Sequence, residues 1–147
     1  MSKRLTKDLN EVNKIYSGKD VSAELENDVA AMWIVTFDGP SGSPYEGGKF
    51  KVRFNCDTYP FKTPKINFIT KIYHPGVSQD KGEICMKALE EGWVPTMGCK
   101  HCIAHILTLL TSPSAENAQD TDVADKFVNH HTQWKATAAE WTQLYAK

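Results

Sequence analysis

The chain has 147 residues, of which 41% are hydrophobic and 24% charged, and its formal net charge is −1. This length fits one domain over residues 1–147 and argues against two. The small net charge excludes a whole-molecule field that recruits nucleic acid or an anionic membrane, and no apolar run approaches the roughly 20 residues that span a bilayer. Four irregularly spaced cysteines are too few for a disulfide scaffold, so we expect a reduced protein of the cytoplasm, the nucleus or both.

The first half of the chain predicts one helix followed by four strands. Apolar residues recur from Leu5 to Tyr16 at spacings of four, three and four, which indicates an amphipathic helix that ends at Ser17-Gly18. Asn27-Asp28 forms a tight turn between two strands, and apolar and polar residues alternate after Gly47-Gly48, as in a strand with one buried face. The strands are expected at residues 21–26, 29–38, 49–55 and 66–69.

The second half predicts an irregular segment followed by three helices. Residues 70–97 show no clear helical or strand period, yet they contain large apolar side chains, so we expect an ordered, packed loop. Helical spacing then returns three times, over residues 102–110, 123–128 and 134–145. Because the strands are grouped before these helices, the sequence predicts an α+β fold with an antiparallel meander.

The most distinctive motif surrounds Cys85. It follows the turn Tyr73-His74-Pro75-Gly76 and precedes Trp93-Val94-Pro95. A cysteine between such turns is typical of a thiol presented on an irregular surface. From the residue alone, the alternative is a small buried hydrophobe, which is the usual role of a free cysteine.

Several motifs, in this order and with these gaps, resemble the ubiquitin-conjugating (E2) family over nearly the whole chain. They are Pro44-Tyr45-Glu46-Gly47-Gly48, Tyr59-Pro60-Phe61-Lys62-Thr63-Pro64-Lys65, the segment from Tyr73 to Pro95, and Glu140-Trp141-Thr142-Gln143-Leu144-Tyr145-Ala146.

The resemblance implies the fold of a small, core-only E2: an N-terminal helix, a four-stranded antiparallel meander, an active-site loop and three C-terminal helices. It also implies a thioester-forming enzyme in which Cys85 accepts ubiquitin, or a ubiquitin-like protein, from an E1. The downstream partner would be an E3 of the RING, HECT or RBR type. We expect no cofactor or metal, and no nucleic-acid or membrane partner.

Two positions depart from the family pattern. Gly76 replaces the Asn of the family's His-Pro-Asn, which is thought to stabilise the oxyanion when an amine attacks the thioester; an oxyanion donor is typically worth about 10²–10³ in rate. Asn117 replaces an acidic residue beside the attacking lysine, although simple turn chemistry also explains Asn there. Glu116 and Asp120 are candidate substitutes, and the Gly76 backbone N–H is a candidate oxyanion donor.

These departures predict that Cys85 hands its cargo preferentially to an E3 cysteine, because lysine attack depends on the two altered positions and thioester exchange does not. The alternative is a conjugation-deficient module of the same fold that docks ubiquitin or an E3. We expect His74 to be structural, because Pro75 makes its segment a rigid turn. For Cys99-Lys100-His101-Cys102 with His105, core packing is favoured over a metal half-site, because a closed zinc site needs four ligands.

The resemblance also assigns partner surfaces. Phe61 in its proline turn is a candidate E3 anchor, with capping of the core as the alternative. The basic residues of the first helix would meet an acidic E1 surface, although charge alone favours a solvated helix face. The full predicted E3- and E1-binding set is Lys3, Arg4, Lys7, Pro60, Phe61, Trp93, Pro95 and Thr96.

Overall fold

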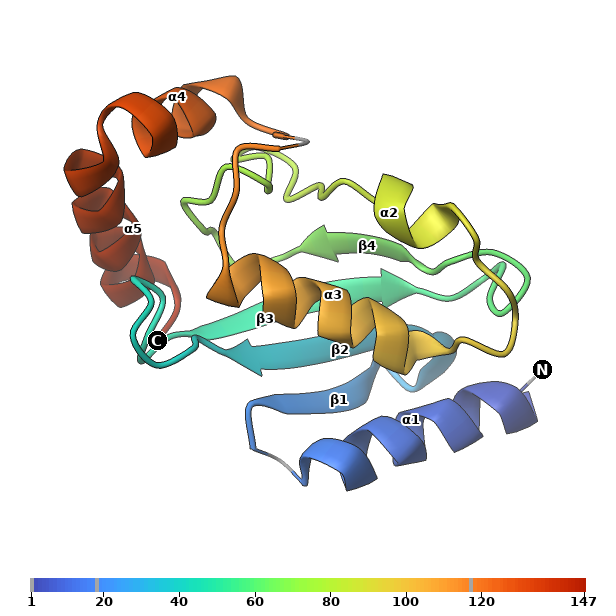
Figure 1. The fold of residues 1–147 in the computed structure, drawn as a ribbon. Coiled ribbons are helices and arrows are strands. Elements are labelled where there is room, and N and C mark those ends of the chain that lie inside the picture. Colours follow the sequence, from blue (N-terminus) through green and yellow to red (C-terminus); the bar gives the residue numbers. More distant parts are fainter. Residues whose placement is uncertain (1, 18, 117) are drawn as a thin grey trace.

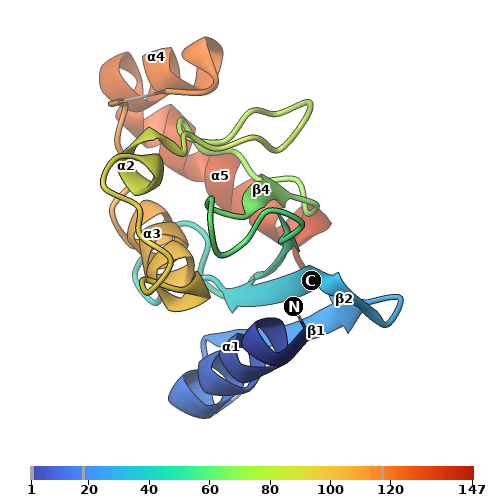
Figure 2. The same cartoon turned by 90° about the vertical axis from the view of Figure 1, so that its right-hand side faces the viewer.

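The computed structural model describes residues 2–17, 19–116 and 118–147 and has the predicted α+β architecture. One antiparallel sheet lies behind the helix α3, and α1 runs along the β1 side of the sheet (Figures 1 and 2). The elements in chain order are α1 (Ser2–Tyr16), β1 (Val21–Glu26), β2 (Val29–Asp38), β3 (Lys49–Asn55), β4 (Lys65–Phe68), α2 (Lys87–Glu90), α3 (Cys99–Thr111), α4 (Thr121–Asn129) and α5 (His131–Tyr145).

The sheet is a simple meander with strand order β1-β2-β3-β4. Alternate residues of β2 and β3 point into the core, so Trp33 pairs with Phe54 and Val35 with Val52 in the antiparallel register, all four fully buried. The β1–β2 connection is the predicted tight turn, with Asn27 and Asp28 at φ of 54° and 61°. These residue types tolerate the left-handed conformation better than most.

The predicted strand bounds match for β1, β2 and β3, whereas β4 begins and ends one residue earlier than expected. The loop prediction for residues 70–97 was incomplete because it missed α2, whose four residues are too few to display a helical period. The first helix ends at Tyr16, as predicted, and Ser17 follows with φ of 51°. Gly18 lies outside the described residues.

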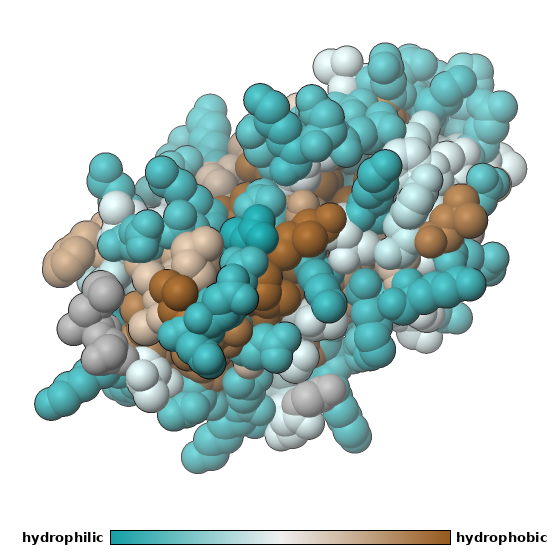
Figure 3. All heavy atoms as spheres, turned by 180° about the vertical axis from the view of Figure 1, so that it is seen from behind, coloured by the Kyte–Doolittle hydropathy of each residue, from teal (hydrophilic) through white to brown (hydrophobic). Residues whose placement is uncertain are grey.

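Helix α3 covers the sheet with the apolar face that the sequence predicts. Ile103, Ile106 and Leu110 are fully buried on it. The C-terminal end of α5 is joined to the sheet, because the Lys49 N–H at the start of β3 donates to the Ala146 carbonyl at 2.6 Å. From behind, hydrophilic side chains cover most of the molecule and apolar atoms show near the centre (Figure 3). Among the described helices, none is long and apolar enough to cross a bilayer.

Candidate active site around Cys85

Cys85 lies on the irregular segment between the sheet and α3, directly after the isolated bridge between Val77 and Ile84. It is half-buried, whereas the other three cysteines are buried. It borders a hollow of about 60 Å³ that combines its own loop with α2, α3 and the loop after α3. We call this the Cys85 hollow; it is lined by Gly76, Cys85, Ala88, His105, Leu109, Ser114 and Glu116.

His74 joins the loop that carries Cys85 to α3. It is fully buried, and its Nε2 lies 2.7 Å from the Leu109 carbonyl oxygen, so this nitrogen carries the proton and donates. Nδ1 then accepts the Gly76 N–H at 2.8 Å. Burial lowers the pKa of His74 to about 4, against the opposing effect of the bond to Leu109. A neutral ring with both nitrogens bonded cannot accept a proton from Cys85 without losing one of these bonds.

The environment of Gly76 argues against its own backbone as an oxyanion donor. Because the Gly76 N–H already donates to His74 Nδ1, this candidate is not supported by the geometry. A Cβ at position 76 would lie 3.2 Å from Cε1 and 3.3 Å from Nδ1 of the His74 ring. The loop is therefore closely packed around position 76.

The two candidate acidic substitutes lie in different places. Glu116 lines the Cys85 hollow and is exposed. Asp120 instead caps α4, where its Oδ1 accepts the Val123 N–H at 3.2 Å and its Oδ2 accepts from Gln79 Nε2 at 3.1 Å. Of the two, Glu116 is the carboxylate at the hollow. Asn117 lies outside the described residues.

A second hollow, of about 330 Å³, lies at the proline turn. Phe61 is 80% exposed there, so it does not cap the core. The turn is tied to the loop before α3 because Trp93 Nε1 donates to the Pro60 carbonyl at 2.8 Å. Lys62 and Glu90, which no motif singled out as functional, give this hollow charge of both signs. We call it the Phe61 hollow; its lining is Phe61, Lys62, Thr63, Glu90 and Trp93.

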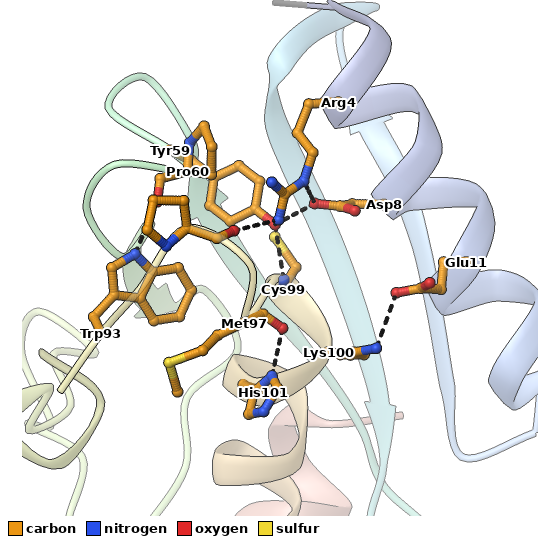
Figure 4. Close-up of polar contacts among 11 residues, drawn as sticks. Arg4, Asp8, Glu11, Tyr59, Pro60, Trp93, Met97, Cys99, Lys100 and His101 are labelled. Atoms are coloured by element: carbon orange, nitrogen blue, oxygen red, sulfur yellow. Dashed lines mark hydrogen bonds and ion pairs between the residues drawn. The ribbon is translucent and has the colours of Figure 1, made fainter.

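Arg4 is part of a polar network rather than a free cation on α1 (Figure 4). Its Nε donates to Asp8 Oδ2 at 2.8 Å and its Nη2 to the Pro95 carbonyl at 2.6 Å. The Tyr59 hydroxyl donates to Asp8 and accepts the Cys99 N–H. This network connects α1, the proline turn and the start of α3, and so holds the exposed Pro95 segment in place.

Besides Phe61 and Pro95, the predicted partner residues Lys3, Lys7 and Thr96 are exposed. The Cys-x-x-Cys pair is buried instead: Cys99 and Cys102 lie on the buried face of α3 and are part of the core. Within the described ranges, no cluster of three or more His, Cys, Asp or Glu is arranged to hold a metal. His105 differs from its neighbours because it lines the Cys85 hollow. The sequence showed only its core-like spacing from Cys102, which obscured this position.

The chain is similar to known proteins over almost its whole length. A family model described as ubiquitin-conjugating enzyme matches residues 4–142. Ubiquitin-conjugating enzyme E2 1 of Schizosaccharomyces pombe is 38% identical over 146 residues, which are 99% of this chain and 67% of that protein. Ubiquitin conjugating enzyme E2 B of Dictyostelium discoideum is 36% identical over 146 residues, 99% and 97% of the two chains.

A solved structure gives the same result for the fold. The E2 domain of a Toxoplasma gondii ubiquitin conjugating enzyme superposes with a TM-score of 0.89 at 33% identity, covering 99% of this chain and 98% of that one. The similarity to these proteins, in sequence and in fold, therefore covers the sheet, the loop that carries Cys85 and the C-terminal helices. This chain belongs to the ubiquitin-conjugating enzyme family.

Proposed function

We propose that the chain accepts ubiquitin, or a ubiquitin-like protein, from an E1 as a thioester on Cys85 and passes it on with an E3. Family membership implies these three partner classes in general. The observation that carries the assignment to Cys85 is its exposure: it is half-buried beside a hollow, whereas the other three cysteines are buried. Free cysteines also suit a cytoplasmic or nuclear protein, where thiols stay reduced.

The preferred acceptor in this proposal is a cysteine of a HECT or RBR-type E3. Gly76 has no side chain to stabilise an oxyanion, and its amide is bonded to His74. Lysine attack needs such help more than thioester exchange does, because an ammonium group loses its proton near neutral pH less readily than a thiol does. Glu116 remains as the carboxylate that lines the hollow.

The proposed docking surface for the E3 is the Phe61 hollow together with Pro60, Pro95 and Thr96. An exposed aromatic on a turn braced by a neighbouring tryptophan is a good interface anchor. Lys3 and Lys7 are proposed to meet the E1, while Arg4 holds the Pro95 segment of the E3 surface in place.

The decisive experiment is a charging assay with E1, ATP and tagged modifiers, resolved on a non-reducing gel. We expect a thiol-sensitive adduct that disappears in Cys85→Ala, and the modifier that forms it identifies the cargo. If no modifier charges Cys85 while the folded protein still binds ubiquitin or an E3, the chain is the alternative, a conjugation-deficient docking module.

The same charged protein tests the acceptor preference by discharge to a free thiol and to free lysine. We expect faster transfer to the thiol than to lysine. Comparable rates of transfer to the two acceptors would contradict the proposed preference. Gly76→Asn should raise lysine discharge if an oxyanion donor is what is missing, by up to about 10²-fold. Gly76→Ala is the matched control, because it also crowds the His74 ring but supplies no donor.

A further inference from the structure

His105 lines the Cys85 hollow and has an unpaired ring nitrogen. It projects from α3, and its Nε2 is buried without a hydrogen-bond partner among the residues that the structure describes. Burying a polar atom without a partner costs free energy, and native proteins leave few such atoms. A residue that has an unpaired nitrogen and lines the same hollow as the half-buried Cys85 is therefore a candidate for a catalytic role.

The other titratable groups nearby do not offer the same chemistry. The hollow also contains Cys85 itself and the exposed carboxylate of Glu116. The short helix α2, which packs against α3, contributes Lys87 and Glu90, and both are exposed. His74 has both nitrogens bonded. In the described part of the chain, His105 is thus the imidazole at this hollow with a nitrogen that no hydrogen bond occupies.

We propose that His105 is the proton acceptor for the incoming thiol when the modifier leaves Cys85, an inference that rests on the proposed function. Once the docking acceptor reaches it, Nε2 of the neutral ring takes the proton of the acceptor S–H, and the resulting thiolate attacks the thioester carbonyl carbon. A new C–S bond forms and the C–S bond to Cys85 breaks. The imidazolium then returns its proton to the Cys85 thiolate. The products are the acceptor thioester and free Cys85, with no oxidant or reductant required.

This chemistry favours a thiol over an amine. Imidazole groups ordinarily titrate near pH 6.5, thiols near 8.5 and lysine ammonium groups near 10.4. A neutral imidazole therefore takes a proton from a thiol across a gap of about 2 pKa units, but from an ammonium group across about 4. His105 would assist transfer to an E3 cysteine much more than attack by lysine, in the direction already expected from Gly76.

The test is single-turnover discharge of the Cys85 thioester to N-acetylcysteine, which has a thiol and no amine, and separately to free lysine, between pH 6.5 and 9. His105→Gln keeps a polar side chain that cannot accept a proton. We expect thiol discharge to fall about 10- to 100-fold at pH 7. The deficit should shrink towards pH 9, because the acceptor thiol then ionises unaided, and lysine discharge should change little.

Further variants separate a proton acceptor from a structural role. His130→Gln, an exposed histidine between α4 and α5, is the matched control and should discharge normally. Added imidazole should restore thiol discharge in His105→Ala. A deficit that is independent of pH, or normal thiol transfer by His105→Gln, overturns the assignment. Failure of Cys85 to charge with any modifier overturns both proposals, whereas normal charging with unchanged thiol transfer overturns only the role of His105.

Discussion

At the scale of single residues, His74 links the loop that carries Cys85 to α3. Its ring bonds a carbonyl of α3 on one side and the Gly76 amide on the other, and both bonds require the neutral Nε2–H form. Because the buried ring resists protonation, its pKa is lowered to about 4. Protonation would remove the acceptor at Nδ1 and release the Gly76 amide.

This pKa predicts a pH dependence of stability. The unfolded chain binds the His74 proton near pH 6.5 and the folded chain only near 4, so stability falls as the pH drops between these values. We expect a loss of about 2 kcal/mol from this group by pH 5 and about 3 by pH 4. Urea unfolding of wild type and His74→Gln from pH 7.5 to 4.5 measures it. The variant should be less stable at pH 7.5, and its free energy of unfolding should depend less on pH than that of wild type. Parallel pH dependences of the two proteins would contradict the lowered pKa of His74.

At the scale of elements, the Tyr59 hydroxyl links three segments that are far apart in the chain. It donates to Asp8 on α1 and accepts the Cys99 N–H, at 3.0 Å, at the start of α3 (Figure 4). Burial is the largest cause that raises the pKa of Tyr59, so the hydroxyl keeps its proton and remains a donor. Asp8 is itself 6% exposed and depends on such donors.

Removing this hydroxyl should therefore destabilise the junction of α1, the proline turn and α3. We expect Tyr59→Phe to lower the free energy of unfolding by about 1–3 kcal/mol, because it leaves a buried carboxylate and a buried N–H each one partner short. Chemical denaturation measures the change. Tyr16→Phe on α1 is the matched control, since no hydrogen bond of its hydroxyl is seen within the described residues, and it should stay within about 0.5 kcal/mol. Equal effects of the two substitutions would show that the network contributes nothing.

At the scale of the whole molecule, we propose that residues 1–147 fold as one domain. The core includes residues of β2, α3 and α5, such as Trp33, Ile103 and Trp134. The end of α5 returns to the start of β3 through the bond between Lys49 and Ala146. Both ends of the chain are thus attached to the same sheet, with α1 packed on β1 and β2.

One domain predicts one cooperative transition. Unfolding in urea followed by tryptophan fluorescence and by far-ultraviolet circular dichroism should give coincident curves with a single midpoint. The tryptophan fluorescence reports on different regions of the fold, because Trp33 lies in the sheet while Trp134 and Trp141 lie on α5. Separate midpoints, or a fluorescence step without loss of secondary structure, would contradict the single domain.

Much of the fold and the position of Cys85 could be predicted from the sequence, because both depend on residues that are close together in the chain. Alternating burial along β2 and β3 follows directly from a period of two, and the left-handed turn follows from Asn27-Asp28. The turns on either side of Cys85 likewise depend on neighbouring residues. Helix α2 escaped prediction because one helical turn shows no period.

The tertiary structure decided what surrounds Cys85. Which nitrogen of His74 is protonated, and that the Gly76 amide is already bonded, depend on Leu109, which lies on α3. His105 reaches the Cys85 hollow for the same reason. These groups are distant in sequence and meet only when α3 packs against the loop, so local sequence patterns could not predict their contact. The sequence by itself pointed to Cys85 as the proposed nucleophile, and packing determined which side chains surround it.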